Sequence, residues 1–176
     1  MSHIMLDLET MGNGPQAAII AIGAVAFDLS GIKDRFYTQV SLESSIGAGL
    51  IADSSTIVWW MLQSDEARAA FKDNDRAPEL SRALWQFTQW FRQVGGEQVW
   101  GNGASFDNAI LSNAYRAVGS EQPWKFWNDR CYRTFKSLFN VVPMQRIGTH
   151  HNALHDAESQ AQHLIDNALA FGLQIN

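Results

Sequence analysis

The sequence has a single cysteine, Cys131, among its 176 residues, so it cannot form an internal disulfide bond. Zinc sites built from several cysteines and histidines at short spacing are excluded for the same reason. A chain without disulfides is typical of a reducing compartment. We therefore expect Cys131 to be a small buried hydrophobic residue.

Long apolar segments are also lacking, since no run approaches the ~20 residues that a membrane-spanning helix needs. The first residues do not resemble a secretory signal, because they enter a predicted strand without a basic segment and a long apolar stretch. These absences favour a soluble, cytoplasmic protein. Repeats, linkers and low-complexity tracts are missing too, and 46% hydrophobic residues can supply a core. We expect one domain over residues 1–176.

An excess of positive charge is absent from the whole chain, whose net charge of −5 argues against a surface that coats nucleic acid. Residues 122–150 are nevertheless locally positive, with five basic residues and one acidic residue. This segment could be a solvated face or a strip that contacts phosphates, and composition does not decide between them. The five are Lys125, Arg130, Arg133, Lys136 and Arg146.

Three predicted strands open the chain. Residues 4–10 alternate apolar and polar side chains, which is typical of a strand. Residues 18–28 are rich in Ile, Val and Ala, and residues 35–40 alternate again. Ser30-Gly31 lies between the last two segments and indicates a hairpin. The opening is therefore predicted to be an antiparallel meander.

The rest of the chain predicts helices that alternate with short strands. Helical patterns cover residues 57–70, 79–94, 105–118 (capped by Ser105), 132–139 and 152–172 (capped by Asn152). Short strands are predicted at residues 98–101 and 125–128. This order indicates an α/β fold with a mixed five-stranded sheet, three antiparallel strands followed by two parallel ones. Helices flank both faces, and the first strand is central.

The first strand carries two acids on one face near its end. Asp7 and Glu9 lie two residues apart, so their side chains point the same way. Like charges so close repel unless a cation or a proton lies between them. A hard ion such as Mg²⁺ or Mn²⁺ would suit these oxygen ligands. Two solvated acids on an edge strand are the alternative.

Three more candidate catalytic residues are predicted to lie near the end of the first strand. Asp107 lies in the first turn of the helix after the 98–101 strand, and Asp156 lies in the first turn of the last helix. Both can approach the end of the first strand. Converging acids need compensation, which two divalent ions ~3.5–4 Å apart provide while they clamp a phosphoryl displacement. His151 could take a proton from the attacking water.

The three segments match a known pattern. The chain carries D-x-E-T from Asp7, N-G-x-x-F-D ending at Asp107 and H-x-x-x-x-D from His151 to Asp156. This set resembles the DEDDh exonucleases, the DnaQ-like 3′–5′ enzymes with a ribonuclease H-like fold. The resemblance implies that Asp7, Glu9, Asp107 and Asp156 hold two Mg²⁺ or Mn²⁺ ions, with His151 as general base. The tyrosine branch of the family is excluded, because its tyrosine position holds Asn152.

Within this family, a subgroup of compact proteins resembles the chain around Trp59-Trp60 and around residues 100–103. It includes phage and prophage exodeoxyribonucleases (exodeoxyribonuclease VIII-like and phage exonuclease A-like proteins) and the actinobacterial polyadenylate-specific ribonuclease. The resemblance implies a nuclease that releases nucleoside 5′-monophosphates from the 3′ end of DNA, single-stranded or overhanging. A 3′–5′ exoribonuclease and a non-cleaving end-binding protein are the alternatives, and the filled catalytic positions argue against the second. Related enzymes also suggest a homodimer.

Residues beside these motifs are candidates for substrate contact. Thr10 and Met11 follow Glu9, where the terminal nucleotide would lie, although Met11 could simply pack in the turn. Trp59 and Trp60 are adjacent and cannot both face one core, so one could stack on a base. Alternatively, one fills the core and the other a dimer interface.

The second and third motifs contain further candidates. Asn102 could orient a carboxylate or contact a phosphate, and Phe106 could contact the nucleotide or pack so that it fixes Asp107. His150 and His155 compete with His151 for the role of base. We expect both to be ordinary surface or capping histidines, because only His151 has the family spacing.

Overall fold

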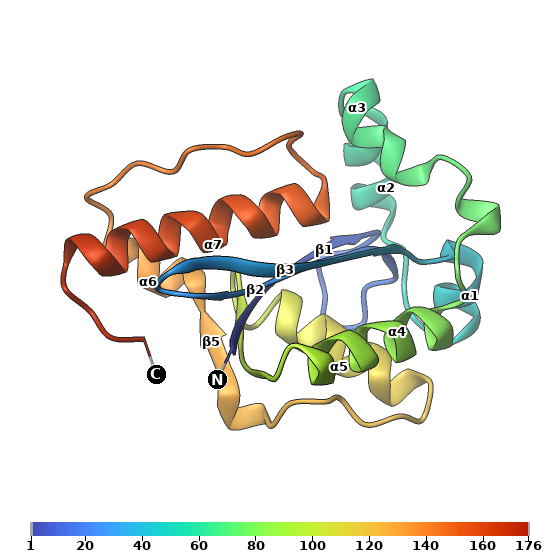
Figure 1. The fold of residues 1–176 in the computed structure, drawn as a ribbon. Coiled ribbons are helices and arrows are strands. Elements are labelled where there is room, and N and C mark those ends of the chain that lie inside the picture. Colours follow the sequence, from blue (N-terminus) through green and yellow to red (C-terminus); the bar gives the residue numbers. More distant parts are fainter. Residues whose placement is uncertain (1, 176) are drawn as a thin grey trace.

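A computed structural model describes residues 2–175, which contain a five-stranded mixed sheet (Figure 1). The strand order is β3-β2-β1-β4-β5. β1 pairs antiparallel with β2 and parallel with β4, so it is central as predicted. β2 and β3 form the antiparallel hairpin, and β4 and β5 are parallel. The strands are β1 (Ser2–Thr10), β2 (Ile19–Asp28), β3 (Gly31–Gln39), β4 (Gly96–Gly101) and β5 (Asp129–Cys131).

Helices cover both faces of the sheet. α7 lies across one face, while α4 and α5 lie against the other, and α2 and α3 stand beyond one end of the strands (Figure 1). The α-helices are α1 (Leu42–Gly47), α2 (Ser54–Met61), α3 (Asp65–Arg68), α4 (Leu80–Gln93), α5 (Asp107–Ala117), α6 (Tyr132–Leu138) and α7 (Ala153–Ala170). Short 3₁₀ turns span Ala69–Phe71, Asn74–Arg76 and Phe126–Asn128.

Two apolar clusters hold the layers together, one on each side of the sheet. Ile4, Leu6 and Leu8 of β1 belong to the cluster that contains the buried residues of α4 and α5. Met5 of β1 belongs to the cluster under α7. The period-two alternation read from the sequence is therefore confirmed, and it leaves Asp7 on the α7 side.

Several boundaries differ from the prediction. The short strand expected at residues 125–128 is a 3₁₀ turn, and β5 follows it directly. Side chains fix this register, because Asn108 and Trp124 both donate to Asp129 Oδ1, at 2.8 and 2.9 Å. β3 begins at Gly31, four residues earlier than expected.

The helix predictions also need correction. The segment 57–70 is not continuous, because Ser64 caps α3 by accepting from Ala67 N–H and so starts a separate helix. Ser105 does not cap α5, which begins at Asp107 after Phe106. Asn152 does cap α7, since its side chain accepts from His155 N–H. Cys131 is half-buried at the end of β5.

Between residues 2 and 175, we find no helix with the length and apolar character needed to cross a membrane.

Candidate active site

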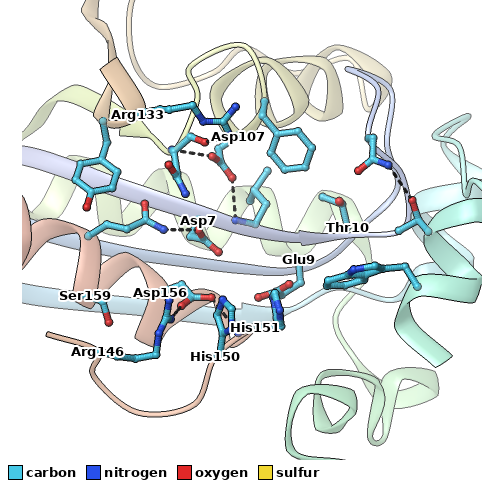
Figure 2. Close-up of a pocket in the computed structure, with 18 of the residues that line it drawn as sticks. Asp7, Glu9, Thr10, Asp107, Arg133, Arg146, His150, His151, Asp156 and Ser159 are labelled. Atoms are coloured by element: carbon cyan, nitrogen blue, oxygen red, sulfur yellow. Dashed lines mark hydrogen bonds and ion pairs between the residues drawn. The ribbon is translucent and has the colours of Figure 1, made fainter. Parts of the chain in front are cut away.

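The end of β1 opens into a cavity of about 670 Å³. Strand β1, the loop after β4, helices α2, α5, α6 and α7 and the segment before α7 meet there (Figure 2). All five residues that the sequence marked as catalytic line this cavity, which confirms that they come together. They are Asp7, Glu9, Asp107, His151 and Asp156.

Three of the carboxylates form one tight group. Asp7, Glu9 and Asp156 each offer an oxygen, and these oxygens lie within 4.8 Å of one another. Figure 2 shows the three carboxylates turned toward the same space. Divalent ions take several oxygen ligands at 2.0–2.6 Å, so small side-chain adjustments would let this group surround one. The set consists of hard oxygen donors, which fits Mg²⁺ or Mn²⁺.

The fourth carboxylate is fixed on the other side of β1. Asp107 Oδ1 accepts from Leu8 N–H at 3.2 Å, and its Oδ2 accepts from Asn102 N–H at 2.9 Å. Gly101 allows this approach, because a Cβ atom there would lie 3.0 Å from the Cβ of Asp107 and 2.4 Å from Asn108 Oδ1. The side chain of Asp107 therefore ties α5 to both β1 and β4.

A glycine allows α7 to bring Asp156 to this point. Gly23 of β2 pairs with Asp7, and a Cβ atom at Gly23 would lie only 2.2 Å from the carbonyl carbon of Ala153. The first turn of α7 thus rests directly on the backbone of β2. One turn after Asp156, Gln160 Nε2 donates to Asp7 Oδ1 at 2.7 Å, which joins α7 to β1 as well.

The clustered carboxylates are electrostatically unfavourable when they are ionised. Removal from water, followed by the charges of Asp107, Glu9 and Asp156, raises the pKa of Asp7 well above its usual value. Burial and the charges of Asp156 and Asp107 raise the pKa of Glu9 to about 8. Burial also raises the pKa of Asp107 to about 7, against the lowering effect of its backbone hydrogen bonds. A bound cation would relieve this cost.

Two buried acceptor oxygens at the cavity also favour a bound cation. Among residues 2–175, Gln160 Oε1 and Asn102 Oδ1 are buried and have no hydrogen-bond partner. Both side chains line the cavity. Buried acceptors are normally satisfied, so the cavity is suited to a donor or a cation in addition to the side chains. The residues present therefore fit divalent metal ions.

His151 lies beside the carboxylates in a strained turn. Its backbone has a φ of +61°, and its N–H donates to Asp156 Oδ2 at 3.0 Å. The imidazole meets the Trp59 ring edge-on, with 4.9 Å between the ring centres. Burial and the neighbouring His150 lower the pKa of His151 below its usual value. The ring is therefore neutral at pH 7 and able to accept a proton.

The segment that carries His151 is attached to α7 by side chains. Val141 and Val142 N–H donate to Asn167 Oδ1, at 2.8 and 3.0 Å. Ile147 N–H donates to Ser159 Oγ at 2.9 Å. His155, expected to be an ordinary capping histidine, accepts from Thr149 N–H through Nδ1 at 3.0 Å. These bonds position the residues between α6 and α7, which we call the 140–152 segment.

Three basic side chains line the same cavity as the acids. Arg133, Lys136 and Arg146 line it, whereas Lys125 and Arg130 do not. Arg133 donates to the carbonyl oxygen of Asn102 at 2.7 Å. Arg146 forms an ion pair with Asp156. Part of the positive segment 122–150 thus reaches the cavity.

The candidate substrate contacts separate into two groups. Thr10, Trp59, Trp60, Asn102 and Phe106 line the cavity. Met11 does not, because its side chain is 5% exposed in the apolar core, which agrees with the turn-packing alternative.

The two adjacent tryptophans differ in burial, as expected for neighbours that cannot both face one core. Trp60 is 3% exposed and donates from Nε1 to the carbonyl oxygen of Thr10 at 2.9 Å. Trp59 is 41% exposed at the cavity. Trp59 is thus the one with a free face for a base.

Sequence reasoning missed some contributors for which signals existed. A glycine inside an apolar strand indicates close approach of another backbone, which would have identified Gly23. Gln160 lies four residues after Asp156 and so shares its helix face. No comparable signal placed His150 at the cavity, where its ring stacks on His151 with 3.8 Å between ring centres.

Comparison with known proteins agrees with this geometry. The family described as "3′-5′ exoribonuclease Rv2179c-like domain" matches residues 2–166. An exodeoxyribonuclease of Enterobacteria phage T4 is 32% identical, over 76% of this chain and 70% of the relative.

Solved structures share the fold at lower identity. A 3′-exonuclease described in the recognition of a histone mRNA stem-loop has a TM-score of 0.64 at 16% identity, over 98% of this chain and 83% of that one. Exonuclease X in complex with 5′ overhanging duplex DNA has a TM-score of 0.62 at 18% identity, over 98% and 94%. The sheet order and the family match together confirm the predicted ribonuclease H-like fold. The chain belongs to the Rv2179c-like family of DnaQ-like 3′–5′ exonucleases.

Proposed function

We propose that this exonuclease is metal-dependent and removes nucleoside 5′-monophosphates from the 3′ end of DNA, single-stranded or overhanging. The observation that carries the proposal is the meeting of carboxylates from three distant segments at one cavity, beside a histidine. The phage T4 relative, which is named an exodeoxyribonuclease, supports DNA as the substrate.

Asp7, Glu9, Asp107 and Asp156 are the proposed ligands of two Mg²⁺ or Mn²⁺ ions. The raised pKa values of Asp7, Glu9 and Asp107 support this assignment, because such acids gain most from a nearby cation. When bound, the two ions lower the pKa of water and neutralise the charge that develops on the phosphate. Gln160 keeps Asp7 oriented toward the cavity through its hydrogen bond.

His151 is the proposed general base. Its lowered pKa leaves a free lone pair near neutral pH. The hydrogen bond from its N–H to Asp156 and the ring contact with Trp59 hold the imidazole beside the acids. In this position it can take the proton of the attacking water, a role that contributes about 10²–10⁴-fold to a rate.

The rest of the cavity would bind the strand end. Trp59 offers an exposed ring on which the terminal base can stack, an interaction worth about 1–3 kcal/mol per base. Arg133 and Lys136 project from α6 into the cavity and can pair with phosphates upstream of the cleaved bond. Thr10, Asn102 and Phe106 complete the lining near the carboxylates.

Cleavage of RNA is the second candidate function, because the matching family is described as a 3′–5′ exoribonuclease. A protein that binds strand ends without cutting is a third. The cavity retains all four carboxylates and the histidine, which supports an active enzyme over a binder.

The test incubates the full chain with 5′-labelled single strands of DNA and of RNA, in Mg²⁺ or Mn²⁺ and then in excess EDTA. We expect a ladder shortened from the 3′ end, faster on DNA, that disappears with EDTA. Asp7→Asn should abolish the ladder, whereas Asp75→Asn, at an exposed position away from the cavity, should not. Faster cleavage of RNA would select the second candidate, and tight binding without products the third.

The homodimer and the single-domain organisation over residues 1–176 remain predictions. Light scattering of the full chain measures the first, and a single cooperative unfolding transition would support the second.

A further inference from the structure

A second group of metal-binding side chains adjoins the carboxylates. His150, His151 and Asp156 each offer a donor atom, and the three donors lie within 4.8 Å of one another. Only Asp156 is shared with the group of Asp7 and Glu9. Figure 2 shows His150 and His151 side by side next to Asp156. The second group therefore has two nitrogen donors where the first has none.

Backbone conformation places the two imidazoles on the same side. Neighbouring residues in an extended chain point in opposite directions. The left-handed conformation of His151, with φ +61°, changes this arrangement. The two rings stack with 3.8 Å between centres and 20° between planes. Residues other than glycine adopt this conformation uncommonly, with asparagine, aspartate and histidine the most frequent, and here the hydrogen bond from His151 N–H to Asp156 helps to hold it.

The chemistry of the donors selects a different class of ion. Imidazole suits zinc, copper and nickel, whereas Mg²⁺ prefers oxygen ligands. Zinc takes two histidines and a carboxylate at about 2.0–2.2 Å, with water in the fourth position. Donors on one tetrahedral zinc ion lie only about 3.3–3.5 Å apart, so donors that now lie within 4.8 Å of one another must move closer by up to about 1.5 Å. One of the two stacked rings must also turn so that both lone pairs face the ion. His150 is exposed and can make this adjustment.

We propose that His150, His151 and Asp156 bind one borderline transition-metal ion, for which Zn²⁺ is the representative, separately from the hard ions of the carboxylate group. Arg146, which forms an ion pair with Asp156, is the cation that this ion displaces. The arginine side chain is 37% exposed and can return to solvent, while the metal ion takes over its charge beside the buried Asp156.

Zinc at this site inhibits cleavage, a consequence that rests on the proposed function. An imidazole nitrogen that binds a metal ion cannot also accept a proton, so His151 loses its role as base. Saturating Mg²⁺ competes with zinc for Asp156, which both groups share, but it competes poorly for the two nitrogen donors, so inhibition should persist. The enzyme would thus be sensitive to free zinc through His150, a residue that the proposed reaction does not use.

The direct test is a calorimetric titration of Zn²⁺ into the full chain in excess Mg²⁺. We expect one zinc ion per chain for the wild type and at least tenfold weaker binding for His150→Gln. His150→Cys should restore tight binding, because a thiolate is a good zinc ligand, and this rescue excludes a merely structural effect of the substitution. Equal zinc affinity of wild type and His150→Gln would overturn the proposal.

The second measurement follows Mg²⁺-dependent cleavage as zinc is added. Because His150 stacks on His151, the rate of each protein with zinc is divided by its own rate without zinc. On this scale, the half-inhibitory zinc concentration of His150→Gln should be at least tenfold higher than that of the wild type. Zinc that binds the wild type without slowing cleavage would overturn the inhibitory role. Cleavage that is absent from the wild type with Mg²⁺ alone would instead overturn the proposed function, while the titration still decides the zinc site.

Discussion

The two faces of β1 show how one strand serves stability and chemistry at once. On the face toward α4 and α5, Ile4, Leu6 and Leu8 are buried in a continuous apolar cluster. On the face toward α7, the strand has buried His3 and Met5 and then presents Asp7 and Glu9. The difference shows that the apolar face stabilises the strand strongly enough for the other face to hold repelling charges.

Rough energies support this division. Burying a leucine or isoleucine side chain contributes about 1.5–3 kcal/mol, so the apolar face supplies several such increments. The acidic face acts in the opposite direction, as the raised pKa values of Asp7 and Glu9 show. If the comparison is correct, substitutions on the two faces should change stability with opposite sign.

The largest effect should come from Asp7→Asn, which removes a carboxylate but keeps its shape. We expect cleavage to be lost, because the proposed metal ions lose a ligand. Without metal, the unfolding temperature should rise, because the amide removes the cost of burying an acid among other acids, the cost that raises the pKa of Asp7. Activity assays and thermal unfolding in EDTA measure the two changes. A variant that cleaves normally, or that melts earlier in EDTA, would contradict the comparison.

Next in size is His151→Gln, which tests chemistry without touching either face of β1. We expect kcat to fall about 10²–10⁴-fold, as is usual when a general base is removed. Mg²⁺ affinity should change little, because His151 is not among the proposed ligands of the hard ions. Single-turnover kinetics and a Mg²⁺ titration separate these quantities. Activity within a few-fold of the wild type would remove His151 from the mechanism.

Leu6→Ala is the matching test on the apolar face. Leu6 is fully buried, and truncating such a side chain costs about 2–5 kcal/mol of unfolding free energy. Urea unfolding in EDTA should show this loss. The folded fraction should still bind Mg²⁺, because the carboxylates remain in place. A loss below about 1 kcal/mol would mean that the apolar face contributes less than the comparison requires.

Gly23→Ala tests whether α7 must lie directly on the backbone of β2. The new Cβ atom would overlap Ala153, so the first turn of α7 has to move, at a cost of about 1–3 kcal/mol. Because Asp156 moves with it, we expect weaker Mg²⁺ binding and slower cleavage. Gly14→Ala is the control, since a Cβ atom there meets no atom within 4 Å. If both variants behave alike, the close approach is not required.

The last prediction concerns the pH dependence of stability in EDTA. Glu9 and Asp107, with pKa values of about 8 and about 7, hold protons in the folded state that the unfolded chain has already released. Stability must therefore fall as pH rises toward 8, by up to about 1.4 kcal/mol per pH unit for each proton.

Metal and histidines provide the controls for this pH effect. Saturating Mg²⁺ should reduce the fall, because bound cations replace the protons. Burial lowers the pKa of His3, His151 and His163, which makes stability rise with pH below about 6.5. Urea unfolding between pH 6.5 and 8 therefore isolates the carboxylates. Stability that rises across this interval would contradict the assigned pKa shifts.

Local sequence patterns predicted a large part of the fold and of the candidate site. Alternation in residues 4–10 gave the two faces of β1, and the cap at Asn152 gave the start of α7. The motif set by itself indicates that the four acids and His151 lie close together. These features succeed because each depends on neighbours in sequence or on a pattern fixed by a shared chemistry.

Features that depend on tertiary contacts were less accessible. β5 lies four residues after its predicted position, because the side chains of Asn108 and Trp124 choose Asp129 as their acceptor. The pairing of Arg146 with Asp156 and the stacking of His150 on His151 arise from the path of the 140–152 segment. Neither periodicity nor composition constrains such a path.

The attachment of the 140–152 segment has a consequence for how the enzyme would respond to strain. Asn167, Ser159 and Asp156 all belong to α7, and all bind the segment that carries His151. When α7 tilts, the imidazole and the Asp156 carboxylate should therefore shift as one rigid unit relative to Asp7 and Glu9. A perturbation at the C-terminal end of α7 could thus change the distance from Asp156 to Asp7 and Glu9, while it preserves the position of His151 relative to Asp156.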